Sequence, residues 1–195
     1  MALMRISGGK WRGRGVRAPA GRTRPTQDMV RQALFSMLSG RVAGAAFLDL
    51  FAGSGAVGLD AASRGASRVC WVEADRGAMR VLRANVEALC GAPGAPAAGP
   101  RECETAIVCA DAFRFLESCE RAAFDIVFAD PPYDRGGGDS RGGRLLSAVA
   151  PALKPGGVFV LEHYIRDAFP EAGGWELQRR KTYGETVLSF FELPR

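Results

Sequence analysis

The chain has 195 residues, of which 47% are hydrophobic and 24% are charged. A chain of this length and hydrophobic content can form one hydrophobic core, so we expect a single soluble domain with a short N-terminal appendage. No run approaches the roughly 18 consecutive apolar residues of a membrane span, and no apolar secretory signal follows the start, so a cytoplasmic protein is expected. Five cysteines without a C-x-x-C pair and a single histidine indicate reduced thiols and no metal site.

The net charge of +5 is concentrated at the N-terminus. Residues 1–31 carry eight basic groups and one acid, for a charge of +7, whereas the remaining residues carry 18 basic and 20 acidic groups, for −2. Arginines interleaved with glycines and a tryptophan are typical of a segment that binds a polyanion such as nucleic acid. The alternative is a solvated, mobile tail. The candidate nucleic-acid contacts in this segment are Arg5, Lys10, Arg12 and Arg14.

Hydrophobic periodicity predicts one helix and then alternating strands and helices. The first helix is expected from about 27 to 39, with Thr26 as its N-cap and Gly40 after its end. Strands are predicted over 46–51, 68–73, 106–111, 124–129 and 157–162. Helices are predicted over 56–64, 76–90, 112–119 and 144–153. This alternation indicates βαβ units and a mostly parallel sheet covered on both faces.

Two further segments complete the expected architecture. Residues 91–100 have the composition of a loop insertion. Residues 175–184 and 185–193 are predicted to form an antiparallel hairpin at the sheet edge, turning at Tyr183 and Gly184. We therefore divide the chain into a basic extension with its helix, residues 1–40, and a main domain, residues 41–195.

A glycine-rich turn follows the first strand of the main domain. Gly53, Gly55 and Gly58 in DLFAGSGAVGL have G-x-G-x-x-G spacing, which permits a tight turn and lets a ligand approach the backbone. Glu73, at the end of the next strand, can accept hydrogen bonds from a ribose. The pattern suits a nicotinamide dinucleotide or S-adenosyl-L-methionine, and a tight turn without a ligand is the remaining alternative.

Acidic residues near the strand ends favour adenosylmethionine. Asp49 stands four residues before the first glycine, where it would repel a pyrophosphate but attract an amino group or a sulfonium. Asp111 and Asp130 follow two later strands, and the carboxyl ends of parallel strands share one edge of the sheet. A row of carboxylates suits a cationic ligand.

The motif DPPY directly follows the run FDIVFA. An exocyclic amine of a nucleobase is a poor nucleophile, so an enzyme that methylates it must orient the nitrogen and stabilise its developing charge. Asp130 and the carbonyl of Pro131 can accept the two amine hydrogens, Pro132 stiffens the segment, and Tyr133 can stack on the base. The plain alternative is a strand exit that is terminated by prolines.

Five stretches, taken in order, resemble the RsmD-type family of bacterial 16S ribosomal RNA guanine-N2 methyltransferases. They are MRISGGKWRGRGVRAP, RPTQDMVRQALFSML, FLDLFAGSGAVGLDAASRGA, VEADRGAMRVLRANVE and FDIVFADPPYDRG. The resemblance implies an α/β, Rossmann-like class I methyltransferase that is dependent on S-adenosyl-L-methionine, with a seven-stranded, mostly parallel sheet. It also implies 16S rRNA in a small-subunit assembly particle as the substrate.

The resemblance also assigns roles by position. Those assigned to the methionine side of the cofactor are Asp49, Phe51, Ala52, Gly53 and Gly55. Glu73 would bind its ribose, and its adenine region would meet Asp111 and Ala112. The target base would contact Asp130, Pro131, Pro132 and Tyr133. A short element ahead of the fold, near the mouth of the site, includes Arg24 and Thr26. The chain departs from the family at 91–104 and in GGGDSRGG after the motif, which affects the outer substrate contacts.

We therefore expect a monomeric enzyme, without a membrane partner, that methylates the N2 amine of a guanine in 16S rRNA. Two alternatives are a DNA methyltransferase that acts on adenine N6 or cytosine N4, and a non-catalytic RNA-binding assembly factor. We expect His163 at the surface or beside the pocket and not as an acid or base. Trp71 and Trp175 are expected in the core or an interface, and Glu162 at a strand end could face the cleft.

Overall fold

The computed structural model describes residues 3–18, 25–91, 103–132, 141–167 and 174–194. For residues 25–27 and 141 it describes the backbone alone. Two predicted site residues, Arg24 and Tyr133, lie outside the described residues, as does the side chain of Thr26. None of the helices among the described residues combines the length and the apolar character needed to cross a bilayer.

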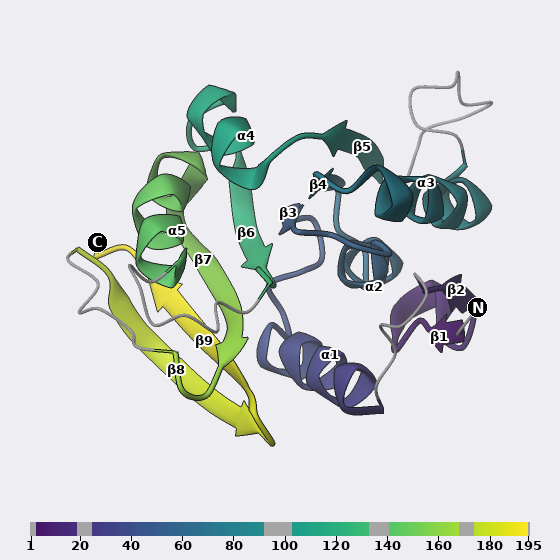
Figure 1. The fold of residues 1–195 in the computed structure, drawn as a ribbon, viewed down its shortest axis with the longest axis horizontal. Coiled ribbons are helices and arrows are strands. Elements are labelled where there is room, and N and C mark those ends of the chain that lie inside the picture. The colour runs from purple at the N-terminus through teal and green to yellow at the C-terminus, as the bar shows by residue number, and fades with distance from the viewer. Residues whose placement is uncertain (1–2, 19–24, 92–102, 133–140, 168–173, 195) are drawn as a thin grey trace.

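A seven-stranded sheet runs through the centre of the described part of the chain (Figure 1). Its spatial order is β5-β4-β3-β6-β7-β9-β8. The first five of these strands are mutually parallel, and β9 and β8 are antiparallel to their neighbours. The strands are β3 (Ala46–Leu50), β4 (Arg68–Glu73), β5 (Glu104–Cys109), β6 (Phe124–Ala129), β7 (Leu153–Tyr164), β8 (Glu176–Tyr183) and β9 (Thr186–Glu192). The expected fold class and the C-terminal edge hairpin are confirmed.

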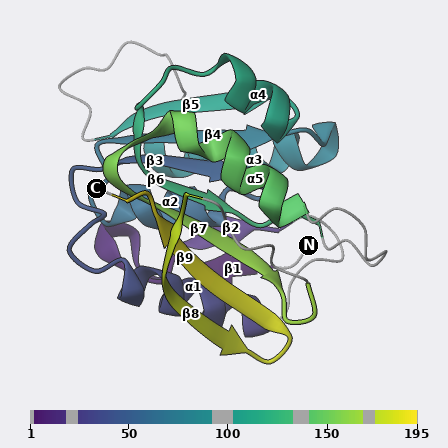
Figure 2. The same ribbon diagram turned by 90° about the vertical axis from the view of Figure 1, so that its left-hand side faces the viewer.

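Helices cover both faces of the sheet (Figures 1 and 2). They are α1 (Pro25–Met37), α2 (Ala56–Ser63), α3 (Arg76–Cys90), α4 (Ala112–Ser118) and α5 (Arg141–Val149). Successive strand residues point to opposite faces, so Phe47 packs with α1, α2 and α3, whereas Leu48 packs with α4 and α5. Both side chains are fully buried, which is why these strands read as continuous apolar runs.

Residues 3–18 form a hairpin beside α2 and α3 (Figure 1). β1 (Leu3–Arg5) pairs antiparallel with β2 (Gly15–Arg17), and the 3-10 helix η1 (Gly9–Trp11) lies between them. Alternation turns Met4, Ile6 and Val16 into the core, while the basic side chains between them face outward. This segment is therefore part of the folded domain and not a mobile tail.

Buried polar side chains anchor the hairpin backbone. Asp60 of α2 accepts hydrogen bonds from the N–H of Ser7 at 3.0 Å and of Gly8 at 3.2 Å, and Ser63 donates its hydroxyl to the Gly8 carbonyl at 2.7 Å. Asn85 of α3 pairs with both backbone groups of one β2 residue and also donates to the Ser54 carbonyl at 2.9 Å. The hairpin is thus tied to the turn that follows β3.

Several predicted boundaries need correction. Helix α1 begins at Pro25, so Thr26 lies in its first turn and is not the N-cap; proline suits a first helical position because its φ is fixed and it has no N–H to satisfy. Strand β5 lies two residues earlier than the predicted 106–111. The predicted helix 144–153 spans Arg141–Val149 instead, followed by the 3-10 helix η2 (Ala150–Ala152) that contains Pro151.

Three aromatic predictions have different outcomes. Trp71 is fully buried in the core, and Trp175 packs against the rings of Phe159 and Phe191, as expected. His163 is not a surface residue: it is buried in β7, where Nε2 lies 2.9 Å from the Ser189 hydroxyl and burial lowers its pKa. It does not line the cavity described below.

Candidate active site

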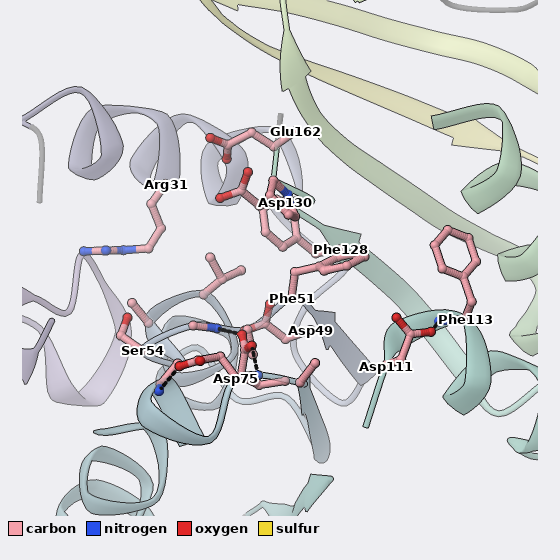
Figure 3. Close-up of a pocket in the computed structure, with 18 of the residues that line it drawn as sticks. Arg31, Asp49, Phe51, Ser54, Asp75, Asp111, Phe113, Phe128, Asp130 and Glu162 are labelled. Carbon is pink, nitrogen blue, oxygen red and sulfur yellow. Dashed lines mark hydrogen bonds between the residues drawn. The ribbon is translucent and has the colours of Figure 1, made fainter. Parts of the chain in front are cut away.

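A cavity of about 940 Å³ opens at the carboxyl ends of the parallel strands (Figure 3). Its walls come from the turn after β3, the ends of β4, β6 and β7, the start of α4 and one side of α1. Open α/β sheets bind ligands at this edge, where the strand order reverses between β3 and β6. The sheet topology therefore places the cavity where sequence reasoning expected a ligand.

Five neighbouring strands each contribute one acid to the cavity. In spatial order these are Asp111 after β5, Glu73 on β4, Asp49 on β3, Asp130 after β6 and Glu162 on β7. The row confirms that the strand ends meet at one edge, and it is one acid longer than the set used to predict the ligand. Carboxylates this dense favour a ligand with positive charge.

The glycine turn shapes the floor of the cavity. Phe51 has a φ of 58° and Gly53 one of 56°, and both line the cavity. A bulky residue in the left-handed region is strained, and such strain is found mainly at functional sites. Gly55 is not among the lining residues; its φ is 79°, and a Cβ there would stand 2.3 Å from Leu82 Cδ1. A Cβ on Gly58 would stand 2.2 Å from Trp71 Nε1. Gly55 therefore lets the turn approach α3, and Gly58 lets α2 pack closely on β4.

The carboxylate of Glu73 holds the turn against β4. One oxygen accepts the N–H of Gly53 at 2.8 Å and the other accepts the N–H of Asp75 at 2.8 Å. A carboxylate oxygen has two lone pairs, so each retains one that can accept a ribose hydroxyl. The predicted ribose contact is therefore chemically open, and the turn is pre-shaped around it.

Asp49 is 1% exposed, and its Oδ2 accepts the N–H of Gly58 at 2.9 Å. Burial raises its pKa well above the usual range, and the charges of Asp130 and Glu73 add to the rise, while the Gly58 N–H opposes it. Burial and the Asp130 charge likewise raise the pKa of Glu162. A cation bound among these groups would relieve both effects.

Asp111 caps the helix at the β5 end of the cavity. Its Oδ1 accepts the N–H of Phe113 at 3.0 Å and that of Arg114 at 3.2 Å, which leaves Oδ2 for a ligand. The ring of Phe113 lines the cavity, with the Arg144 guanidinium 4.5 Å from its centroid. Ala112 is buried and does not line the cavity. Sequence reasoning missed Phe113, although it stands only two residues after Asp111.

The DPP segment forms the β6 end of the cavity. Asp130 and Pro132 line it beside Phe128, whereas Pro131 is buried and is not among the lining residues. Figure 3 shows the side chain of Asp130 directed into the cavity next to that of Glu162. The strand exit therefore faces the cavity with two of the four predicted residues, Asp130 and Pro132.

The predicted nucleic-acid contacts lie outside the cavity. Arg5, Lys10, Arg12 and Arg14 are exposed on the N-terminal hairpin. Arg31 belongs to the same basic segment of the sequence, residues 1–31, but it lines the cavity. Its guanidinium donates a hydrogen bond of 2.7 Å to Asp60. The two residues are 29 positions apart, and no sequence signal links them.

The Rossmann-like sheet and its acid-lined cavity define a class I S-adenosylmethionine-dependent methyltransferase. The family model described as conserved hypothetical protein 95 matches residues 4–192, and the chain belongs to that family, the RsmD type.

Curated and solved relatives support this placement. Ribosomal RNA small subunit methyltransferase D of Escherichia coli K12 is 32% identical over 197 residues, covering 97% of this chain and 89% of that protein. The structure of yhhF from Escherichia coli has a TM-score of 0.81 at 30% identity and covers 98% of both chains. A hypothetical protein of Thermus thermophilus has a TM-score of 0.74 at 33% identity, covering 97% of this chain and 99% of that one.

Proposed function

We propose that the protein transfers a methyl group from S-adenosyl-L-methionine to the exocyclic N2 amine of a guanine in 16S rRNA. The observation that carries this proposal is the placement of Asp130 and Pro132 in the same cavity as Asp49 and Glu73. Asp49 and Glu73 thus form a part of the cavity that suits a cationic nucleoside. Asp130 and Pro132 form a part that suits the amine of a base. The E. coli relative's name supports small-subunit RNA as the substrate.

The residues present fit adenosylmethionine. Asp49 would attract its ammonium group, Glu73 its ribose hydroxyls, and Asp111 with Phe113 its adenine. When bound, adenosylmethionine supplies an electrophilic methyl group on a positively charged sulfur. Phe51, Ala52 and Gly53 line the cavity and would provide the floor against which that group is positioned.

Asp130 would accept one hydrogen of the guanine amine, and the carbonyl of Pro131 the other. These bonds make the nitrogen more tetrahedral and aim its lone pair at the methyl carbon. The lone pair forms the new N–C bond while the electron pair of the broken C–S bond stays on sulfur. The surplus proton then leaves the nitrogen for water or Asp130. Tyr133 is proposed to stack on the base, which must be turned out of its helix.

The basic hairpin is proposed to dock on phosphates of the RNA, with Arg24 and Thr26 near the mouth of the site. Its exposed cations lie on a hairpin whose backbone is hydrogen-bonded to Asp60, Ser63 and Asn85, so binding would cost little backbone entropy. We further propose a monomer that acts in the cytoplasm on a small-subunit assembly particle.

The test compares substrates and one variant. Wild-type protein is incubated with labelled methyl donor and undermodified small subunits, free 16S RNA or DNA, and the methylated nucleoside is identified by mass. N2-methylguanine in the small-subunit RNA is expected. N6-methyladenine or N4-methylcytosine would support the DNA alternative instead, and binding of subunits without any methylation would support the assembly factor.

An Asp130→Ala variant separates chemistry from cofactor binding. Turnover should be lost while the affinity for adenosylmethionine stays near that of the wild type, because Asp130 is assigned to the base. Glu87→Ala, on the exposed side of α3, is the matched control with full activity expected. Near-normal activity of the Asp130 variant would refute the assignment.

A further inference from the structure

Glu162 stands next to Asp130 in the wall of the cavity (Figure 3). Strands β6 and β7 are parallel, and Ala129 is opposite Leu161, so the next residue of each strand falls side by side. Both carboxyl groups line the cavity, and Figure 3 shows them close together, away from Asp49 and Asp111. The base that Asp130 binds must therefore also meet Glu162.

Nucleobases differ in what they present beside their exocyclic amine. Guanine carries a ring N1–H next to its N2 amine, so two neighbouring nitrogens donate hydrogen bonds. Adenine and cytosine carry a ring nitrogen with a lone pair beside their amine, which repels a carboxylate. Carboxylates accept hydrogen bonds and cannot donate them when ionised. Two adjacent carboxylates, when both are ionised, are therefore complementary to guanine but not to adenine or cytosine.

We propose that Glu162 accepts the N1–H of the target guanine while Asp130 accepts a hydrogen of its N2 amine, so that Glu162 determines base specificity. The inference rests on the proposed function, because it assigns a role within the same site. Glu162 is thereby a binding and positioning residue: it fixes the rotation of the base in its plane and so the direction of the amine lone pair.

The electrostatics of the two acids agree with this role. Burial raises the pKa of Glu162, and the charge of Asp130 adds to the rise, so keeping both acids ionised is costly without a ligand. Guanine offers two hydrogen-bond donors and so offsets this cost. Adenine and cytosine place a lone pair beside the carboxylates and so increase it. A site with such a requirement rejects the wrong base strongly, because a mismatched base leaves buried polar groups unpaired.

The second acid also distinguishes this site from one that acts on DNA amines. The tetrapeptide DPPY by itself suits the amines of adenine, cytosine and guanine alike. Glu162 comes from β7, 32 residues further along the chain than Asp130. The specificity is therefore set by the pairing of β6 with β7 and not by the motif.

The test uses 16S RNA in which 2-aminopurine replaces the methylated guanine, introduced by splinted ligation and assembled into small subunits. 2-Aminopurine keeps the amine at C2 but has a lone pair at N1. Wild-type enzyme should methylate it about 10- to 100-fold more slowly than guanine, the effect of losing one good base contact. In Glu162→Gln, the ratio of the rate on guanine to the rate on 2-aminopurine should fall by about tenfold, because the glutamine amide can donate a hydrogen bond to N1 of 2-aminopurine. The loss of O6 in 2-aminopurine affects both enzymes and cancels in the comparison.

Glu87→Gln is the control and should leave the ratio at the wild-type value. Equal rates of the wild-type enzyme on guanine and 2-aminopurine would overturn the inference without using any variant, and so would an unchanged ratio in Glu162→Gln. In both cases N2-methylguanine still forms, so the proposed function stands. Absence of N2-methylguanine from the unmodified substrate would instead overturn the proposed function and this inference with it.

Discussion

The guanidinium Nε of Arg31 donates a hydrogen bond of 2.7 Å to Asp60 Oδ2, which joins α1 to α2 across the N-terminal hairpin. The side chains are 5% and 0% exposed. The Asp60 carboxylate also accepts the N–H and the hydroxyl of Ser7, and Arg31 reaches the carbonyl of Arg5. One buried ion pair therefore connects the cavity wall, the hairpin and the helix that follows the glycine turn.

Asp60→Ala should lower the free energy of unfolding by about 3 kcal/mol, because it removes the buried partner of Arg31 and the acceptor of the Ser7 and Gly8 N–H groups. Asp28, which is 45% exposed and 3.0 Å from the Arg31 guanidinium, remains as a weaker partner. Urea denaturation followed by circular dichroism measures this change. Lys154→Ala is the matched control: its pair with Asp125 is 40% and 39% exposed, and the expected loss is below about 1 kcal/mol. Similar losses for both variants would show that the Arg31–Asp60 pair is not a structural anchor.

Asp49→Asn should stabilise the fold at neutral pH and weaken cofactor binding. The raised pKa means that folded Asp49 holds its proton more tightly than the unfolded chain does, so the ionised carboxylate costs stability at pH 7. Asparagine keeps an oxygen for the Gly58 N–H and carries no charge. Its advantage should grow as pH rises above about 4, the unfolded pKa, and vanish below it.

Thermal melting of Asp49→Asn and wild type from pH 4 to pH 8 measures this effect. Calorimetric titration with adenosylmethionine should show about 10- to 100-fold weaker binding, since a charge-assisted hydrogen bond is lost. The melting temperature of the variant minus that of the wild type should be larger at pH 7 than at pH 4. A smaller difference at pH 7 would contradict the prediction.

Replacing Lys10 and Arg12 by alanine should reduce the salt dependence of RNA binding. Each lost phosphate contact should make the negative slope of log K against log salt shallower by about 0.7–0.9. Deleting the hairpin is a poorer test, because it also removes the buried side chains of Ile6 and Val16. Filter binding at several salt concentrations measures the slope.

The control for that pair is Arg179→Ala with Lys181→Ala, two exposed basic residues on the edge strand β8. These substitutions remove the same charge and should leave the slope nearly unchanged. A larger drop for the β8 pair than for the hairpin pair would move the RNA-binding surface to the other side of the molecule.

The cysteines should differ widely in reactivity. Burial raises the pKa of Cys70 and Cys90 to about 12 and that of Cys103 to about 11, so few of these thiols ionise at pH 8. Cys109 is exposed and should be alkylated first. Iodoacetamide labelling with peptide mass spectrometry measures the order, and labelling in urea, where all five should react alike, is the control.

The sequence predicted the features that depend on near neighbours. The glycine turn, the acid before it and the DPP segment after a buried strand are local patterns, and the structure places Gly53, Asp49 and Asp130 in one cavity. The predicted ends of helices and strands were wrong where the same residues suit two local conformations. Short apolar runs permit a shift of two residues, as β5 shows, and Pro151 allowed a helix to end early.

Only the tertiary structure decided which distant residues meet. Arg31 looks like part of a basic arm until folding sets it beside Asp60, and Glu162 is one strand-end acid among several until the β6–β7 register sets it beside Asp130. Helix and strand periodicity show which face a residue occupies but not which segment lies opposite. That choice depends on strand order and on the burial of charge, which are properties of the whole chain.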